Sequence, residues 1–104
     1  MGDTFIAIET ELGPRLISAD EVPGTDGILA VNMHRGGFAL THVPTGHAVA
    51  IVKDRSAATK IGERIWAALS VKQRTSWRST SAATVRRATP KAVCALVEGE
   101  SAKS

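Results

Sequence analysis

The chain has 104 residues and a formal net charge of +3, which is enough sequence for one domain with a modest core. Its one cysteine, Cys94, excludes an internal disulfide and suits a reducing compartment. No apolar run approaches the roughly 20 residues of a membrane span, and the first residues lack the pattern of a signal peptide, so we expect a soluble, cytoplasmic protein without a membrane partner.

The first segment of the chain predicts a β-hairpin. Thr4–Thr10 is rich in strand-forming residues, Gly13-Pro14 interrupts it, and residues 15–18 resume the strand pattern. Residues 19–26 then read as a polar loop around Pro23-Gly24.

Residues 27–52 predict three consecutive antiparallel strands. Gly36-Gly37 is suited to a two-residue hairpin loop, and Pro44-Thr45-Gly46 to a three-residue loop. These turns would place Met33 opposite Leu40, Leu40 opposite Ala50, and Val43 opposite His47.

The alternation of side chains along these strands separates two faces. One face is almost entirely apolar and is the expected core surface: Leu29, Val31, Met33, Phe38, Leu40, Ala48, Ala50 and Val52. The other face is mixed, and we predict a partner-binding surface there around Asn32, His34 and Thr41. The alternative is that another helix covers this face as well.

Residues 56–69 predict the main helix, with Asp54 or Ser56 as its cap. Its apolar residues recur at spacings of three and four, so it should pack on the apolar sheet face, with Gly62 allowing a close approach. Together these elements predict a single α+β domain over residues 1–98, with an antiparallel sheet of about five strands over residues 4–53.

The C-terminal part reads as a basic helical segment over residues 72–98, followed by a disordered tail over residues 99–104. We expect a Ser/Thr-rich connector at residues 71–81, and a helix that begins after Ser79 or Ser81. Thr89-Pro90 would start the last helix, over residues 91–98.

The charges are divided unevenly along the chain. Residues 1–63 contain eight acidic residues and five lysines or arginines, a net charge of −3. Residues 64–97 contain seven lysines or arginines and no acidic residue, a net charge of +7. Such a block favours an acidic partner.

The basic block is the main candidate for function. Its cations could neutralise phosphates, and the aromatic residue among them could stack on an exposed base. The predicted nucleic-acid-binding residues are Arg64, Lys72, Arg74, Trp77, Arg78, Arg86, Arg87 and Lys91. The alternatives are a solvated surface, or a contact with the acidic surface of a partner protein.

Catalytic and metal chemistry have little support in the sequence. The predicted register puts His34 and His47 at opposite ends of one face and His42 on the other, without a ligand motif beside them. Cys94 falls on the inner side of the last predicted helix, where cysteine behaves as a small apolar residue. We therefore expect a binding protein that is not an enzyme and has neither a metal nor a cofactor.

The segment from Thr41 to Gly46, THVPTG, lies between two predicted strands and is followed by the main helix. Over residues 36–69 this arrangement resembles short uncharacterised proteins of phages and plasmids. The resemblance implies a mobile-element accessory protein that acts by binding, either to nucleic acid or to a host protein, such as a defence complex that it inhibits. An exposed edge strand would also allow a homodimer.

Overall fold

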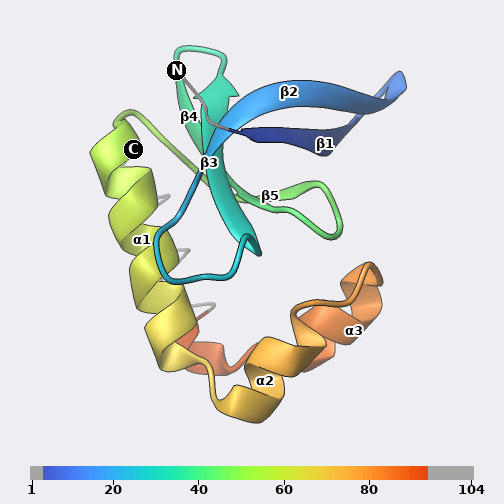
Figure 1. The fold of residues 1–104 in the computed structure, drawn as a ribbon, viewed down its shortest axis with the longest axis vertical. Coiled ribbons are helices and arrows are strands. Elements are labelled where there is room, and N and C mark those ends of the chain that lie inside the picture. The colour runs from blue at the N-terminus through green and yellow to red at the C-terminus, as the bar shows by residue number, and fades with distance from the viewer. Residues whose placement is uncertain (1–3, 94–104) are drawn as a thin grey trace.

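Among the residues that the structure describes, five antiparallel strands follow one another along the chain and side by side in the sheet, and three helices and a short helical turn come after them (Figure 1). The computed structural model describes residues 4–93. Its elements are β1 (Thr4–Thr10), β2 (Gly13–Glu21), β3 (Leu29–His34), β4 (Gly37–His42), β5 (His47–Val52), α1 (Arg55–Ala68), α2 (Val71–Ser76) and α3 (Ala82–Arg87). This confirms the predicted α+β class, whereas the tail and most of the last predicted helix lie outside the described residues.

The hairpin between β3 and β4 differs from the prediction in its register. Met33 pairs with Phe38, and the loop is Arg35-Gly36. Gly37 belongs to β4 instead, where a Cβ atom would collide with the backbone carbonyl of Val52. Because the register differs by two residues, an even number, every side chain of β3 and β4 keeps its predicted face.

A β-bulge interrupts the pairing of β4 with β5. Leu40 pairs with Ala50 as predicted, but the next pair is Thr41 with Ala48, so Val49 has no partner in the ladder. His42 therefore pairs with His47, and the predicted pairing of Val43 with His47 is wrong. The bulge also puts His47 on the face of His42, where a regular strand would have put it on the opposite face.

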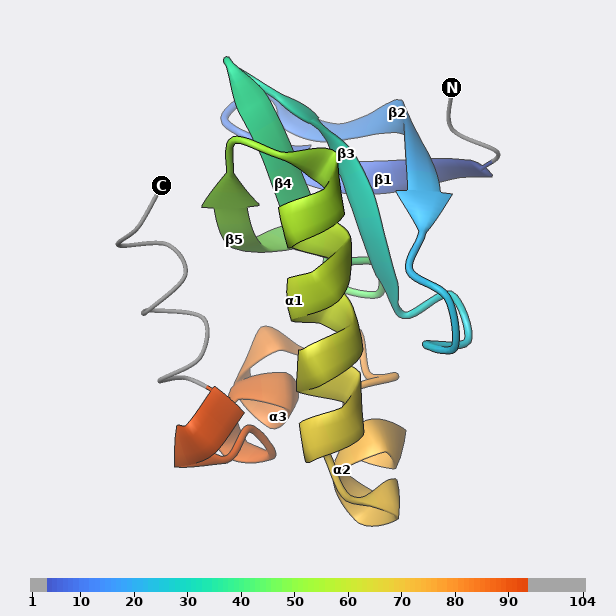
Figure 2. The same ribbon diagram turned by 90° about the vertical axis from the view of Figure 1, so that its left-hand side faces the viewer.

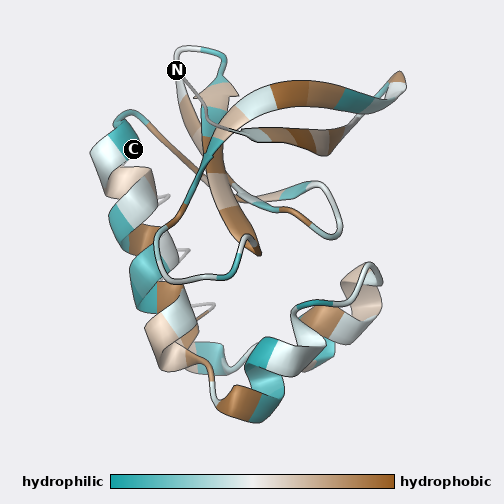
Figure 3. Cartoon of the chain, in the orientation of Figure 1, coloured by the Kyte–Doolittle hydropathy of each residue, from teal (hydrophilic) through white to brown (hydrophobic). Residues whose placement is uncertain are grey.

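Helix α1 lies across the apolar face of the sheet and contacts β3, β4 and β5 (Figures 1 and 2). Its hydrophobic residues face the strands (Figure 3), and Ile61 and Ile65 are fully buried. Asp54 occupies the N-cap position, although its side chain makes no capping hydrogen bond. Gly62 allows the predicted close approach, because a Cβ there would lie 3.0 Å from side-chain atoms of Leu40 and Val22.

The second face of the sheet is covered by the β1–β2 hairpin. Strand β2 pairs with β1 over residues 13–19 and with β3 at Asp20 and Glu21, so the hairpin can fold back over the sheet. Ile6, Ala19 and Ala30 form a second, smaller core there. The sequence left open whether a helix covers this face, and the structure places a hairpin on it.

The predicted connector contains a helix, α2, which the sequence analysis missed. Ser70 and Gln73 form a capping box, in which each side chain accepts a hydrogen bond from the backbone of the other. Helix α3 begins after Ser81, which is the second of the two predicted starts, and the Ser81 hydroxyl accepts from the Thr84 amide. Residues 91–93 are again helical after Pro90. Between residues 4 and 93, no helix is long and apolar enough to cross a membrane.

Candidate functional site

Trp77 lies inside the protein and not on its surface. The residue is only 3% exposed and belongs to the main hydrophobic core together with Ile65 and Leu69. Its ring meets the ring of His42 edge to face, with 5.2 Å between the ring centroids. The prediction that Trp77 stacks on a nucleic-acid base is therefore wrong, because the chain turns back after α2 and buries the indole against the end of the sheet.

His42 connects the turn between β4 and β5 to the C-terminal segment through two hydrogen bonds of its ring. Its Nε2 lies 2.5 Å from the backbone carbonyl of Trp77, and its Nδ1 lies 2.8 Å from the hydroxyl of Thr45. A carbonyl can only accept, so Nε2 carries the proton, and the neutral ring accepts from Thr45 at Nδ1. Burial lowers the pKa of His42, although the bond to Trp77 opposes this effect, and nearby His47 lowers that pKa further.

Two of the predicted phosphate-binding arginines have structural partners. The Arg74 guanidinium donates from Nε and Nη2 to the backbone carbonyl of Trp66, at 3.0 and 2.8 Å, and lies 5.3 Å from the centroid of the Trp66 ring. Arg78 forms an ion pair of 2.8 Å with Asp26 in the loop between β2 and β3. Arg74 thus closes the corner between α1 and α2, and Arg78 connects this region to the sheet.

The other predicted cations are exposed on the helices. Arg64 lies on the outer side of α1. Helix α2 carries Lys72, α3 carries Arg86 and Arg87, and Lys91 follows Pro90. No acidic residue occurs between residues 64 and 93. The structure therefore brings two of the eight predicted residues, Lys72 and Arg87, to the same cavity, whereas Arg86 lines a different one.

A groove of about 460 Å³ runs between α2 and α3. Lys72 lines it from α2 and Arg87 from α3, and polar side chains lie between them, among them Gln73, Ser76 and Thr84. Cationic groups with neighbouring hydroxyl and amide donors are the usual partners of a phosphate group. We call this feature the α2–α3 groove.

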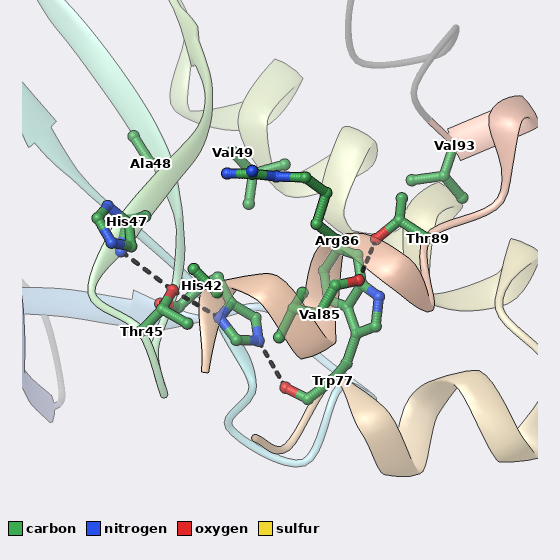
Figure 4. A pocket seen from close by; sticks show the side chains of 11 residues that line it. His42, Thr45, His47, Ala48, Val49, Trp77, Val85, Arg86, Thr89 and Val93 are labelled. Carbon is green, nitrogen blue, oxygen red and sulfur yellow. Dashed lines mark hydrogen bonds between the residues drawn. The ribbon is translucent and has the colours of Figure 1, made fainter. Parts of the chain in front are cut away.

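A second cavity, of about 490 Å³, lies on the other side of α3, between that helix and β5 (Figure 4). We call it the α3–β5 pocket. It is lined by His42, Thr45, His47, Ala48, Val49, Trp77, Ala82, Val85, Arg86, Thr89 and Val93. No sequence pattern indicated this pocket, because its walls come from segments that are far apart in the sequence.

Asn32, His34 and Thr41 do lie close together, but they do not form a flat exposed surface. All three line a cavity of about 890 Å³ under the tip of the β1–β2 hairpin. Asn32 and Thr41 are only 5% and 1% exposed, and the Thr41 hydroxyl donates to Asn32 Oδ1 at 2.6 Å. The prediction of a solvent-exposed binding surface is wrong at these two residues. The hairpin covers both, and their side chains are hydrogen-bonded to each other.

Metal-binding side chains do not gather anywhere within residues 4–93, where no group of three His, Cys, Asp or Glu is close enough to hold an ion. Comparison with known proteins adds no relative: no family model, curated protein or solved structure matches this chain.

Proposed function

We propose that this protein is a small nucleic-acid-binding module that contacts phosphates through the α2–α3 groove and the cations around it. The observation that supports the proposal is the position of Lys72, Arg86, Arg87 and Lys91, which are exposed on adjacent short helices without an acidic neighbour in sequence between residues 64 and 93. Cations arranged in this way neutralise phosphates and release counterions.

The proposed interface is smaller than the basic block of the sequence. Trp77 has no exposed ring face on which a base could stack, and Arg74 and Arg78 have partners within the protein. Phosphate contact by four cations predicts that the affinity falls about 10²-fold when the salt concentration rises from about 50 to about 200 mM.

The test is a salt titration of binding to short DNA and RNA oligomers. The Lys72→Glu/Arg87→Glu variant should bind much more weakly at the lower salt concentration and show a flatter salt dependence. Arg15→Glu/Arg35→Glu is the matched control, because it changes the net charge equally on exposed residues of β2 and the β3–β4 turn. Equal binding by the groove variant and the parent would refute the proposal.

A protein partner is the second candidate, as expected for an accessory protein that inhibits a host complex. The observation that favours it is the outer face of the β1–β2 hairpin, where Phe5 is 68% and Leu16 is 67% exposed. Capture of a partner from nuclease-treated cell lysate by the parent, but not by a Phe5→Ser/Leu16→Ser variant, would support this function. Loss of capture after nuclease treatment would point back to nucleic acid.

A further inference from the structure

The floor of the α3–β5 pocket contains an unused hydrogen-bond donor. Trp77 Nε1 is buried, and it has no hydrogen-bond partner among the described residues. The indole lies at the back of the pocket, with its nitrogen on the side of Val85 and Thr89 (Figure 4). The Thr89 hydroxyl donates to the Val85 carbonyl at 2.7 Å and makes no hydrogen bond with Trp77 Nε1. A buried N–H without an acceptor is costly, so a ligand oxygen or nitrogen placed there would be favoured.

The walls and the mouth of the pocket differ in chemistry. The walls are apolar. Strand β5 supplies Val49, helix α3 supplies Val85, and the segment after α3 supplies Val93. The exposed side chain of Arg86 extends across the pocket toward β5 (Figure 4). A simple anion would leave the apolar walls wet, and a hydrocarbon would leave Nε1 unsatisfied. A flat ring with carbonyl acceptors, attached to a phosphate, matches all three parts of the pocket.

The pocket is continuous with the proposed phosphate-binding surface. Arg86 and Arg87 are consecutive residues at the end of α3, and they line the pocket and the groove respectively. Thr89 lines both cavities. A strand whose phosphates follow the groove would therefore pass the mouth of the pocket at the end of α3.

We infer that the α3–β5 pocket receives one unstacked base of a single-stranded nucleic acid, whose carbonyl accepts from Trp77 Nε1 while Arg86 contacts the adjoining phosphate. This inference rests on the proposed function and narrows its substrate. The bases of a duplex are paired and stacked, so taking one out costs free energy, whereas a single strand offers its bases at little cost. The protein therefore prefers single strands.

The test compares three oligomers of equal length: oligothymidylate, the corresponding duplex, and an abasic strand that keeps every phosphate but lacks the bases. We expect the oligothymidylate to bind about tenfold more tightly than the abasic strand, which is within the range measured for single bases held by aromatic and apolar residues. The Ala82→Phe variant fills the pocket from α3 and should remove this difference. Ala83→Phe, at the next and exposed position of α3, is the matched control and should keep it.

A second measurement follows ligand binding to the unaltered protein, and a variant serves only to assign its spectrum. Uridine 5′-monophosphate should shift the Trp77 indole N–H resonance, assigned with a Trp66→Phe variant, and ribose 5-phosphate should not. Equal binding of all three oligomers, with an unmoved Trp77 resonance, would overturn the base pocket. The proposed phosphate contact would survive that result if binding were still lost in Lys72→Glu/Arg87→Glu, whereas failure of every oligomer to bind would end both proposals.

Discussion

His42 Nε2 donates to the backbone carbonyl of Trp77 across 35 residues of sequence, at a distance of 2.5 Å. This hydrogen bond joins the end of β4 to the segment between α2 and α3. The two side chains also contact each other edge to face, so this buried pair joins the sheet to the C-terminal helices, in addition to the Arg78–Asp26 ion pair. The α3–β5 pocket depends on this junction, because His42 and Trp77 both line it.

The first prediction concerns the dependence of stability on pH. The pKa of His42 is lowered in the folded protein, chiefly by burial, so the unfolded chain takes up this proton first as the pH falls below about 6.5. Stability is therefore full above that pH and is lost progressively as the pH falls toward the lowered pKa. Urea unfolding at about pH 7.5 and about pH 5.5 measures the loss.

The control for this prediction is a comparison of two variants. His42→Gln should be less stable than the parent at neutral pH and should show a smaller loss on acidification. His34→Gln, at an exposed position, should keep the pH dependence of the parent. An unchanged pH dependence in His42→Gln would contradict the assignment.

The second prediction is that Gly62→Ala destabilises the protein although it improves helix propensity. Alanine favours the helix by about 1 kcal/mol. Its Cβ would lie 3.0 Å from Leu40 Cδ1 and Val22 Cγ2, however, and crowding a packed core costs about 1–3 kcal/mol. Chemical denaturation should show a net loss of about 1 kcal/mol. Ala67→Gly, on the exposed side of α1, is the control that measures the helix-propensity effect alone. A Gly62→Ala variant more stable than the parent would contradict the prediction and show that Leu40 and Val22 can shift to admit the new Cβ.

The third prediction separates structural from phosphate-binding cations. Arg74→Ala leaves the Trp66 carbonyl without its two donors and should lower the stability by about 1–2 kcal/mol. Lys72→Ala, one residue into α2 and exposed, should change stability by less than about 0.5 kcal/mol and weaken binding. Thermal unfolding and oligomer binding of both variants check this, and the opposite pattern would reverse the two roles.

The fourth prediction concerns self-association through the outer face of the β1–β2 hairpin. Phe5 and Leu16 are exposed there, and β1 ends the row of strands, so we expect a weak homodimer. Phe5→Ser/Leu16→Ser should weaken the dimer in sedimentation equilibrium and leave the unfolding midpoint nearly unchanged. A parent protein that stays monomeric up to millimolar concentration would refute it.

The sequence predicted those parts of the fold that have a regular period. Alternation in β3 and β4 identified the face that packs on α1 even though the loop was misplaced, because the error was an even number of residues. The spacing of Ile61 and Ile65 identified the inner side of α1, since both are fully buried.

The remaining features have no periodic signal. A bulge inserts one residue without changing the composition of β5, so the pairing of His47 could not be read from alternation. Trp77 is one aromatic residue among polar ones, and its burial depends on a contact with His42 far away in the sequence. Asn32 and Thr41 suggested a wet face, but a mutual hydrogen bond lets both be buried.

The bulge in β5 has a consequence for how this protein tolerates change. The ladder between β4 and β5 is complete without Val49, since Leu40–Ala50 and Thr41–Ala48 already follow each other. Val49 is therefore not needed for the pairing of β4 with β5, although it packs against the main core and supplies a wall of the α3–β5 pocket. Deletion of Val49 would leave the paired residues of β4 and β5 with their partners. It would remove an apolar side chain from the wall of the pocket and from the edge of the core.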